Sequence, residues 1–272
     1  MTIRGLLTAA VCAGSIVFAA GAAQADKLDD ILSSGKLRCG VMLDFPPAGF
    51  RNEKNEPAGY DVDYCRDMAE ALGVEAEIVE TPSPQRIPAL VANRVDVGIA
   101  STTATLERAK TVGFSIPYMV YKDVVLVRKD SAIEQFDDLP GKKVATVRGT
   151  TPELEYLGHC EGWSEGCNYE SYGSDSEQTL ALRQGQADAV FTSSAYAATL
   201  VASPQGKDLQ VCCNVPGFTD WTGIIVNRNE TAFLNWVNLF IWRQVESGRY
   251  AELYSKWVND DVPTLALQNV HY

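Results

Sequence analysis

The sequence predicts an α/β protein made of two similar halves, and two observations support this. Short apolar runs alternate with amphipathic helical patterns in a β-α-β-α-β order through the first hundred residues. That order is typical of a parallel sheet with helices on its faces. Residues 90–101 also match residues 182–193 at an offset of 92 residues without a gap. Each copy ends a helix, turns, passes an Asp and runs as a strand to a Ser, so we expect two α/β lobes with a cleft between them.

The first half contains two predicted helices between predicted strands. Helix 60–72 is amphipathic and is followed by Gly73, a residue that favours the left-handed conformation at a helix C-terminus. Helix 85–93 follows Ser83-Pro84, where Ser can cap and Pro can occupy the first helical position. The predicted strands are residues 37–43, 75–80 and 95–100.

The second half begins with a predicted strand at residues 143–147, which corresponds to strand 37–43 of the first half. Residues 231–257 are predicted to be helical because their apolar residues recur at helical spacing. An apolar stripe of this kind usually packs on a core. Its members are Phe233, Trp236, Val237, Phe240 and Ile241.

Charge and composition exclude several classes of protein. The 272 residues include 23 basic and 35 acidic ones, giving a net charge of −12, and no block of Lys or Arg occurs. Nucleic acid and anionic membranes require a basic face, so neither is expected as the main partner. With 46% hydrophobic residues the chain has an ordinary globular composition, which argues against disorder and coiled coils.

Residues 1–25 are predicted to be a signal peptide. Arg4 is their only charge, an uncharged run covers residues 5–23, and Ala23-Gln24-Ala25 fits the small-x-small pattern of signal peptidase. We expect export to the periplasm with cleavage after Ala25. An uncleaved anchor is the alternative, because the run is about long enough to span a membrane. No later segment has that length and apolarity.

Six cysteines remain after the leader, which contains Cys12. An even number in an exported chain indicates disulfides. Six cysteines allow 15 pairings. Cys160 and Cys167, which flank a short Gly-containing loop, are one expected pair. The other expectations are Cys39 with Cys65, and one of Cys212 and Cys213 with a neighbouring cysteine.

The sequence gives no reason to expect a metal, a cofactor or a catalytic residue. It lacks a CxxC motif and has two histidines, His159 and His271. Zinc sites and nucleophilic triads need such residues at defined spacings.

The segment after strand 95–100 could bind a carboxylate. Thr105 is a predicted N-cap with Arg108 three residues later, so helix N–H groups and a guanidinium would converge. Arg binds carboxylates through two parallel hydrogen bonds. Ser101 and Thr103 add hydroxyls. The alternative is a capping Thr beside a solvated Arg.

A second predicted helix start faces this segment from the other lobe. Residues 143–147 run into Gly149, Thr150 and Thr151, with Thr151 as the predicted cap and Pro152 in the first helical turn. Its N–H groups could bind the same anion.

Two other segments could also contact a ligand. Phe45 follows the first strand next to Pro46-Pro47 and could stack on an apolar part of the ligand. Arg86 begins a predicted helix and could meet a ligand side chain, or form an ion pair within the protein instead. Asp61 and Asp63 are predicted to be structural, as a cap or dipole partner of helix 60–72.

These segments resemble the family 3 extracellular solute-binding proteins, the periplasmic receptors of polar amino acid ABC importers. The resemblance covers essentially the whole chain after the leader, in the family's order. The motifs that carry it are residues 37–41, 46–47, 59–63, 86–90, 95–97, 101–108, 114–118, 149–151 and 185–190.

The resemblance implies a two-lobed clamshell of the periplasmic-binding-protein type II fold. Lobe 1 would contain residues 26–121 and 222–272, and lobe 2 residues 122–221. The lobes would close on a small carboxylate ligand, and an inner-membrane ABC permease would recognise the closed form. The protein would act as a monomer without a cofactor.

The resemblance also implies roles for individual residues. Arg108 would hold the ligand α-carboxylate with Ser101 and Thr103, and lobe 2 would add Thr150 and Thr151. Phe45 would pack on the ligand, and Ser83 and Arg86 would meet a side-chain carboxylate.

One position departs from the family pattern. Ser193 stands where members that bind α-amino acids carry an Asp for the ligand ammonium. Burying an ammonium without a carboxylate is costly. Either Asp44 or Asp220 takes its place, or the ligand lacks an α-ammonium.

Two other functions stay open. The first is a periplasmic enzyme resembling cyclohexadienyl dehydratase, which needs a general acid in the cleft. Glu153 and Asp44 are the candidates. The second is a clamshell sensor that binds a solute other than an amino acid without transporting it.

Overall fold

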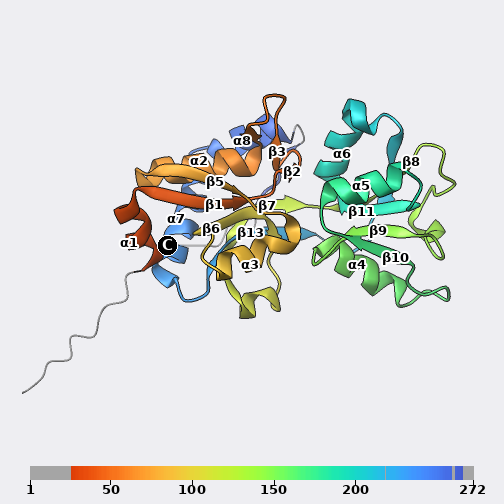
Figure 1. The fold of residues 1–272 in the computed structure, drawn as a ribbon, viewed down its shortest axis with the longest axis horizontal. Helices are drawn as coiled ribbons and strands as arrows, with labels where there is room; N and C mark the ends of the chain where they lie inside the picture. The colour runs from red at the N-terminus through yellow and green to blue at the C-terminus, as the bar shows by residue number, and fades with distance from the viewer. Residues whose placement is uncertain (1–25, 218, 259–260, 266–272) are drawn as a thin grey trace, which may run out of the picture.

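The computed structural model describes residues 26–217, 219–258 and 261–265, which form two α/β lobes side by side (Figure 1). The predicted signal peptide lies outside the described residues. We call the part built on the sheet β5-β1-β6-β13-β7 lobe 1 and the part built on the sheet β10-β9-β11-β8-β12 lobe 2. A small antiparallel sheet, β2-β3-β4, adds to lobe 1.

Helices and strands alternate along the chain, as the sequence predicts for an α/β fold. The helices are α1 (Lys27–Ser34), α2 (Tyr60–Leu72), α3 (Arg86–Val91), α4 (Thr151–Cys160), α5 (Asp175–Arg183), α6 (Ser194–Ala202), α7 (Thr231–Glu246) and α8 (Arg249–Trp257). The strands are β1 (Lys36–Val41), β2 (Asp44–Phe45), β3 (Gly49–Arg51), β4 (Pro57–Ala58), β5 (Glu75–Glu80), β6 (Val97–Thr103), β7 (Val112–Tyr121), β8 (Asp123–Arg128), β9 (Val144–Val147), β10 (Tyr169–Tyr172), β11 (Ala189–Ser193), β12 (Leu209–Asn214) and β13 (Asp220–Asn227).

The two large sheets share one topology. In lobe 1, β5, β1 and β6 are parallel, and β13 and β7 continue the sheet antiparallel. In lobe 2, β10, β9 and β11 are parallel, and β8 and β12 continue it antiparallel. The predicted mostly parallel sheets flanked by helices are therefore confirmed.

The chain crosses between the lobes twice, and the two crossings are alike. The first leads from edge strand β7 of lobe 1 into β8, the fourth strand of the other sheet. The second leads from edge strand β12 of lobe 2 into β13, the fourth strand of the first sheet. Each entering strand begins with an aspartate, Asp123 in β8 and Asp220 in β13.

The internal repeat is visible in the backbone. Asn93 and Gly185, which are 92 residues apart, both have positive φ angles, of 54° and 71°. Asp96 accepts a hydrogen bond from the backbone N–H of Arg38 in the neighbouring strand, at 3.0 Å. Asp188 accepts the same bond in lobe 2 from the N–H of Lys143, at 2.9 Å. The matched segments therefore fold alike.

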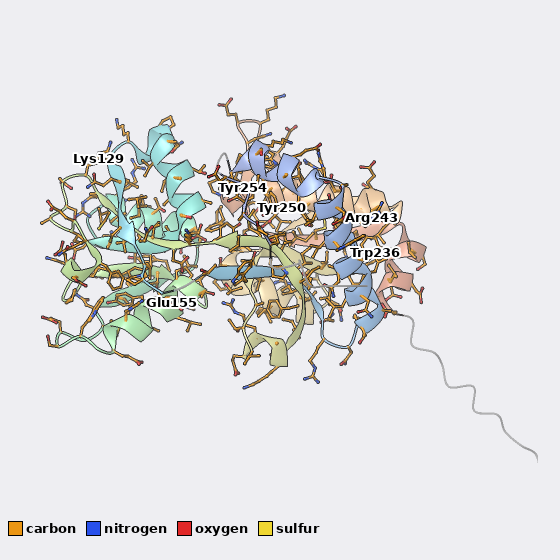
Figure 2. The ribbon with its side chains drawn as sticks, turned by 180° about the vertical axis from the view of Figure 1, so that it is seen from behind. Lys129, Glu155, Trp236, Arg243, Tyr250 and Tyr254 are labelled. Carbon is orange, nitrogen blue, oxygen red and sulfur yellow. A yellow bond between two sulfur atoms is a disulfide. The ribbon has the colours of Figure 1, made fainter. Side chains whose placement is uncertain are left out.

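The predicted C-terminal stripe packs on the core of lobe 1. Phe233, Val237, Phe240 and Ile241 are buried there, and Trp236 packs against them. The predicted helical stretch 231–257 is two helices, because the chain turns at Ser247-Gly248, where Gly248 has a φ of 82°. Tyr250 and Tyr254 on α8 are also buried in this core (Figure 2).

Several boundaries differ from the sequence prediction. Helix 60–72 and strand 75–80 are confirmed, whereas predicted helix 85–93 is a 3-10 turn at Ser83–Gln85 followed by the shorter α3. Strand 95–100 is β6, which continues to Thr103. In the part of the chain that the structure describes, no helix is long and apolar enough to cross a membrane.

Two of the expected disulfides are present. Cys39 is bonded to Cys65 and Cys160 to Cys167. The expectation that Cys212 or Cys213 pairs with a neighbouring cysteine is wrong, since both are free. They are adjacent on β12, with a β-bulge that starts at Val211, and lie against the core of lobe 2. The other cysteines of the described residues are already bonded.

Candidate functional site

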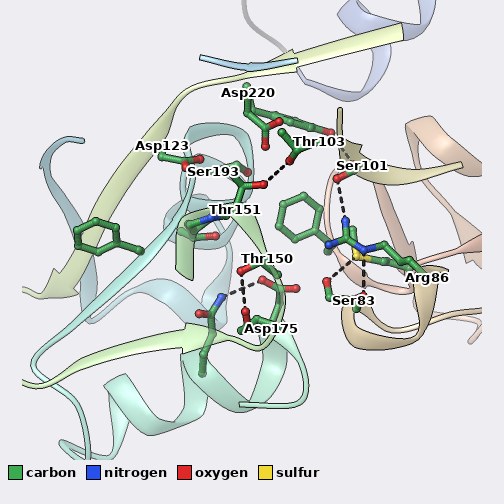
Figure 3. Close-up of a pocket in the computed structure, with 18 residues that line it drawn as sticks. Ser83, Arg86, Ser101, Thr103, Asp123, Thr150, Thr151, Asp175, Ser193 and Asp220 are labelled. Atoms are coloured by element: carbon green, nitrogen blue, oxygen red, sulfur yellow. Dashed lines mark hydrogen bonds between the residues drawn. The ribbon is translucent and has the colours of Figure 1, made fainter. Parts of the chain in front are cut away.

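A cavity of about 40 Å³ lies between the two lobes (Figure 3). Its walls come from strand ends and helix starts of both sheets and from the two crossing strands. The lining residues are Met42, Phe45, Ser83, Arg86, Ser101, Thr103, Tyr121, Asp123, Val147, Thr150, Thr151, Pro152, Asp175, Gln178, Phe191, Thr192, Ser193 and Asp220. Of the ten residues predicted to bind ligand, eight line this cavity. The other two, Asp44 and Arg108, lie beside it.

Hydrogen bonds join the lobes on one side of the cavity. The hydroxyl of Thr151 donates to the hydroxyl of Thr103 at 2.5 Å. The guanidinium of Arg108 donates to the carbonyl of Gly149 at 2.7 Å. The structure is therefore a closed arrangement of the lobes.

The lobes also touch on the other side. The N–H of Asp175 donates to the carboxylate of Asp44 at 3.1 Å. The ring of Phe45 stacks on that of Tyr196 in lobe 2, with centroids 5.1 Å apart. Phe45 thus lies between the lobes, on the cavity wall.

The predicted helix start at Thr105 is not present. The chain forms a 3-10 turn at Arg108–Lys110, and the hydroxyl of Thr105 accepts the N–H of Arg108 at 3.2 Å. Thr105 is therefore not the predicted N-cap, since Glu107 precedes the turn, and no α-helix follows, because β7 begins at Val112 and leaves too few residues for one. Lobe 1 therefore offers no helix dipole to an anion at this point.

Arg108 is half-buried beside the cavity. Its guanidinium donates to the carbonyl of Thr103 at 2.9 Å, as well as to that of Gly149. Burial, with repulsion from the Arg86 charge, lowers the pKa of Arg108 to about 10. It is still protonated at neutral pH and makes no ion pair with a carboxylate of the described residues.

Arg86 forms part of the cavity wall and is buried. Its Nε donates to the carbonyl of Ser83 at 3.1 Å, and its Nη1 donates to the carbonyls of Ala100 and Ser101 at 2.9 and 2.8 Å. Burial lowers the pKa of Arg86. These bonds fix the guanidinium, and no carboxylate of the described residues pairs with it, so its charge is available to an anion.

Ser101 has an unusual backbone conformation for a residue other than glycine. Its φ is 47°, in the left-handed region, and such strain is most often found at functional sites. Its hydroxyl contacts the carboxylate of Asp61 and the hydroxyl of Tyr121, at 3.3 and 2.9 Å. Asp61 is buried behind the cavity wall in the first turn of α2, whose N-cap is Gly59, so it is not the cap of that helix.

The helix start in lobe 2 differs from the prediction by one residue. Thr150, rather than Thr151, is the N-cap of α4 and accepts the N–H of Glu153. Thr151 is thus free to reach across to Thr103. Glu153 accepts the N–H of Gly149 at 2.7 Å and holds the loop that carries both threonines.

Ser193 lines the cavity and caps a helix. Its hydroxyl accepts the N–H of Tyr196 at 3.2 Å, at the start of α6. In the sheet it lies directly opposite Asp123 of β8.

Five polar residues of the wall were not predicted from the sequence: Tyr121, Asp123, Asp175, Gln178 and Thr192. Asp175 begins α5 behind the cap Ser174, and the amide of Gln178 donates to its carboxylate at 2.8 Å. The Ser174-to-Glu177 capping pattern could have indicated this helix start. Asp123 is the second residue after the predicted lobe boundary at 121/122, and this position could have identified it.

The wall carries one cationic and three acidic side chains, namely Arg86 and Asp123, Asp175 and Asp220. Burial raises the pKa of Asp123 to about 8, and repulsion from Asp220 and Glu155 adds to this. Burial raises the pKa of Asp220 to about 6. Burial and repulsion from Asp44 raise the pKa of Asp175 to about 8.

The described residues contain no group of His, Cys, Asp and Glu arranged to hold a metal ion. What the cavity offers is a fixed cation on one wall and acidic oxygens on the others. That arrangement can bind a small solute that carries both charges.

Comparison with known proteins gives consistent results. Residues 37–260 match the bacterial extracellular solute-binding proteins, family 3. The ABC transporter glutamine-binding protein GlnH of Bacillus subtilis (strain 168) is 31% identical over 271 residues, which cover 94% of this chain and 93% of that protein.

Solved structures agree with this match. A mutant of the protein ArgBP from T. maritima is 35% identical and superposes with a TM-score of 0.78, over 86% of this chain and all of that one. The ancestral amino acid-binding protein AncCDT-1, described as a precursor of cyclohexadienyl dehydratase, is 33% identical with a TM-score of 0.75, over 86% of this chain and all of that one.

Proposed function

Since this chain belongs to the bacterial extracellular solute-binding proteins of family 3, we propose that it is the substrate-binding protein of an ABC importer. It captures an amino acid or a related small carboxylate in the cavity between its lobes. Of the relatives above, GlnH is by name a glutamine-binding protein of an ABC transporter, and AncCDT-1 is by name an amino acid-binding protein.

The observation that carries this proposal is Arg86. A guanidinium that is buried, fixed by three carbonyl acceptors and without an ion-pair partner is suited to a carboxylate that arrives from outside. Because the cavity is closed on both sides by contacts between the lobes, such a ligand would be taken up by lobe closure.

We assign the ligand carboxylates to the wall of lobe 1 and the helix start of lobe 2. The α-carboxylate would bind near Arg108, Ser101 and Thr103, with Thr150 and Thr151 from α4. Arg86 and Ser83 would receive a second polar group, and Phe45 would pack on the carbon skeleton.

The cellular setting is also proposed. Residues 1–25 direct export and are removed, so the protein acts in the periplasm as a monomer. An inner-membrane ABC permease is the partner that recognises the closed form. The lobe boundaries at residues 121/122 and 221/222 belong to the same proposal, although the second falls within β13, which begins at Asp220 in the sheet of lobe 1.

An enzymatic role is the weaker alternative. Of the two candidate general acids, Glu153 holds the Gly149 loop and is not on the cavity wall, and Asp44 accepts the N–H of Asp175. The relation to a precursor of cyclohexadienyl dehydratase calls for one direct check, namely incubation with prephenate and arogenate. Product formation would replace the proposed function.

A ligand screen tests the proposal. The purified chain from residue 26 onward, unfolded and refolded to remove bound solute, is screened by thermal shift against amino acids, dicarboxylates, opines and betaines. At a concentration of about 100 Kd a true ligand adds about 2.7 kcal/mol of stability. Failure of every carboxylate to raise the melting temperature would contradict the proposal.

The site assignment has its own variant. Arg108→Ala should weaken binding by about 2–5 kcal/mol, the usual cost of removing one partner of a desolvated charge pair. Arg94→Ala, an exposed arginine of the same lobe, is the matched control. Unchanged affinity of the Arg108 variant in calorimetry would remove Arg108 from the site.

A further inference from the structure

We propose that Asp123 and Asp220 together bind a primary ammonium group of the ligand, so that the solute is an amino acid with a free –NH₃⁺ rather than a betaine or a simple dicarboxylate. This inference rests on the proposed function and names the class of solute it serves. It also resolves the question raised by Ser193, since the acids that replace the expected one are on the two crossing strands.

The first argument is that these carboxylates have oxygen atoms without hydrogen-bond partners. Asp123 is 1% exposed and Asp220 is 6% exposed, and both line the cavity (Figure 3). Both oxygens of Asp123 and Oδ1 of Asp220 have no partner among the described residues. Buried polar atoms are rarely left in this state, because each one costs about 1–3 kcal/mol.

The number of these atoms fits a primary ammonium. The two carboxylates have three oxygens without a donor, and an –NH₃⁺ group has three N–H donors and no acceptor. The amide oxygen of Gln178 on the same wall also has no donor, but it is neutral and does not attract a cation as a carboxylate does. A trimethylated nitrogen carries the same charge but has no N–H, so it would leave all three oxygens unsatisfied. A dicarboxylate would bring further negative charge toward them.

The other buried acids near the cavity already have donors. Asp175 accepts the amide of Gln178 at 2.8 Å. Asp61 accepts the hydroxyl of Tyr118 at 2.8 Å and that of Ser101 at 3.3 Å. This leaves Asp123 and Asp220 as the pair that requires a ligand donor.

The position of the pair supports the same assignment. Asp123 lies opposite Ser193 in neighbouring antiparallel strands, and side chains of directly opposed residues lie on the same face of a sheet. The carboxylate of Asp123 therefore lies close to the place that the carboxylate of an Asp at position 193 would occupy. Asp220 adds a second carboxylate from the other crossing strand, hydrogen-bonded to the Thr103 hydroxyl.

The two carboxylates repel each other in the absence of a cation. Repulsion from Asp220 is one cause of the raised pKa of Asp123, with burial as the larger cause. A cation between them removes this repulsion. Because each acid begins the strand by which the chain enters a lobe, the ammonium would also stabilise the approach of the two crossings.

The opposite wall completes a site for a zwitterion. Arg86 carries the positive charge of lobe 1, and its guanidinium is held by backbone carbonyls instead of a carboxylate. A solute with a carboxylate toward the arginines and an ammonium toward Asp123 and Asp220 matches both walls.

A panel on the unaltered protein tests the ligand class. The probes are the twenty protein amino acids, glutarate and succinate as carboxylates without nitrogen, and glycine betaine as a carboxylate with a trimethylated nitrogen. We expect one or more amino acids to bind in calorimetry, with the other three probes at least tenfold weaker. Binding of glutarate, succinate or betaine as tight as that of any amino acid would overturn the inference while leaving a solute receptor in place.

Variants test the two residues. Asp123→Asn and Asp220→Asn should each weaken the best amino acid at least tenfold. The same changes should raise the melting temperature of the ligand-free protein at pH 8, because a buried unpaired carboxylate is removed. Opposite signs for ligand affinity and ligand-free stability are not expected of residues with a purely structural role.

Asp208→Asn is the matched control, since Asp208 in lobe 2 also has a buried oxygen without a partner but lies outside the cavity. It should leave affinity unchanged. Equal affinity of the Asp123 and Asp220 variants and the unaltered protein would overturn the assignment. Binding of no probe at all would count against the proposed function itself.

Discussion

The two lobes use equivalent positions to build walls of opposite charge. At the offset of 92 residues, Ser83 and Arg86 of lobe 1 correspond to Asp175 and Gln178 of lobe 2, and all four line the cavity. Lobe 1 thus has a neutral residue and a cation where lobe 2 has an acid and a neutral residue. The same backbone arrangement can therefore bind either the negative or the positive end of a dipolar solute. The side chains at these positions determine which end each lobe binds.

The repeat also diverges where its matched strands end. In lobe 1 the strand passes through Ser101, with its left-handed backbone, and continues to Thr103. In lobe 2 the strand stops at Ser193, which caps α6. A shared sequence pattern thus gives a strained strand in one lobe and a helix start in the other.

The largest expected effect comes from Arg86→Gln, which removes the cation of the lobe 1 wall and places there the residue type of its lobe 2 counterpart, Gln178. We expect ligand affinity to fall by about 30-fold or more, consistent with a loss of about 2–5 kcal/mol for one partner of a buried charge pair. Calorimetry with the best amino acid measures this. Arg94→Gln serves as the control, and an affinity within threefold of the unaltered protein would refute the role of Arg86.

The second test is the pH dependence of the ligand-free protein. Asp61, Asp123, Asp175 and Asp220 have raised pKa values of about 7, 8, 8 and 6. Between the unfolded value near 4 and these values, the folded state holds more protons than the unfolded state. Stability therefore falls as the pH rises from about 5 to 8.

The expected size is a fall in melting temperature of roughly 3 °C or more. One pKa unit on one carboxyl corresponds to about 1.4 kcal/mol, and about 1 kcal/mol moves the midpoint by roughly 2–4 °C in a chain of this length. Calorimetric scans at several pH values measure it. A saturating amino acid should flatten the curve, whereas a melting temperature that rises from pH 5 to 8 would contradict the raised pKa values.

The smallest expected effect is a difference in unfolding free energy between variants of Asp96 and of its lobe 2 counterpart, Asp188. Both accept a backbone N–H, but Asp96 also pairs with the Arg38 guanidinium at 2.7 Å. Asp96→Asn should therefore cost about 1 kcal/mol more unfolding free energy than Asp188→Asn, since hydrogen bonds to charged groups contribute more than neutral ones. Urea titrations of the two variants measure the difference, and equal costs would show that the ion pair contributes nothing.

Much of this architecture could be predicted from the sequence because it follows from local patterns. Helix 60–72 is bounded by its amphipathic period and Gly73, and the lobe repeat is a direct match of residues. Strand ends place polar residues at one edge of each sheet, so the predicted binding residues gather around one cavity.

The remaining features depend on contacts that no local pattern contains. The helix expected after Thr105 is absent because the next strand starts too soon, and Asp123 was not recognised because its meaning comes from the register of β8 against β11. The expectation for Cys212 and Cys213 was wrong, because no local pattern shows that the other four cysteines of the described residues are all paired with one another.

The placement of β13 has a consequence for how the molecule is assembled. This strand lies between β6 and β7, although it is made about a hundred residues after them. As the chain emerges from the ribosome, β6 and β7 lack the strand that connects them until β13 is synthesised. All strands of the second sheet have been synthesised by then. The inserted half can thus finish folding first, and the N-terminal half, although synthesised earlier, finishes last.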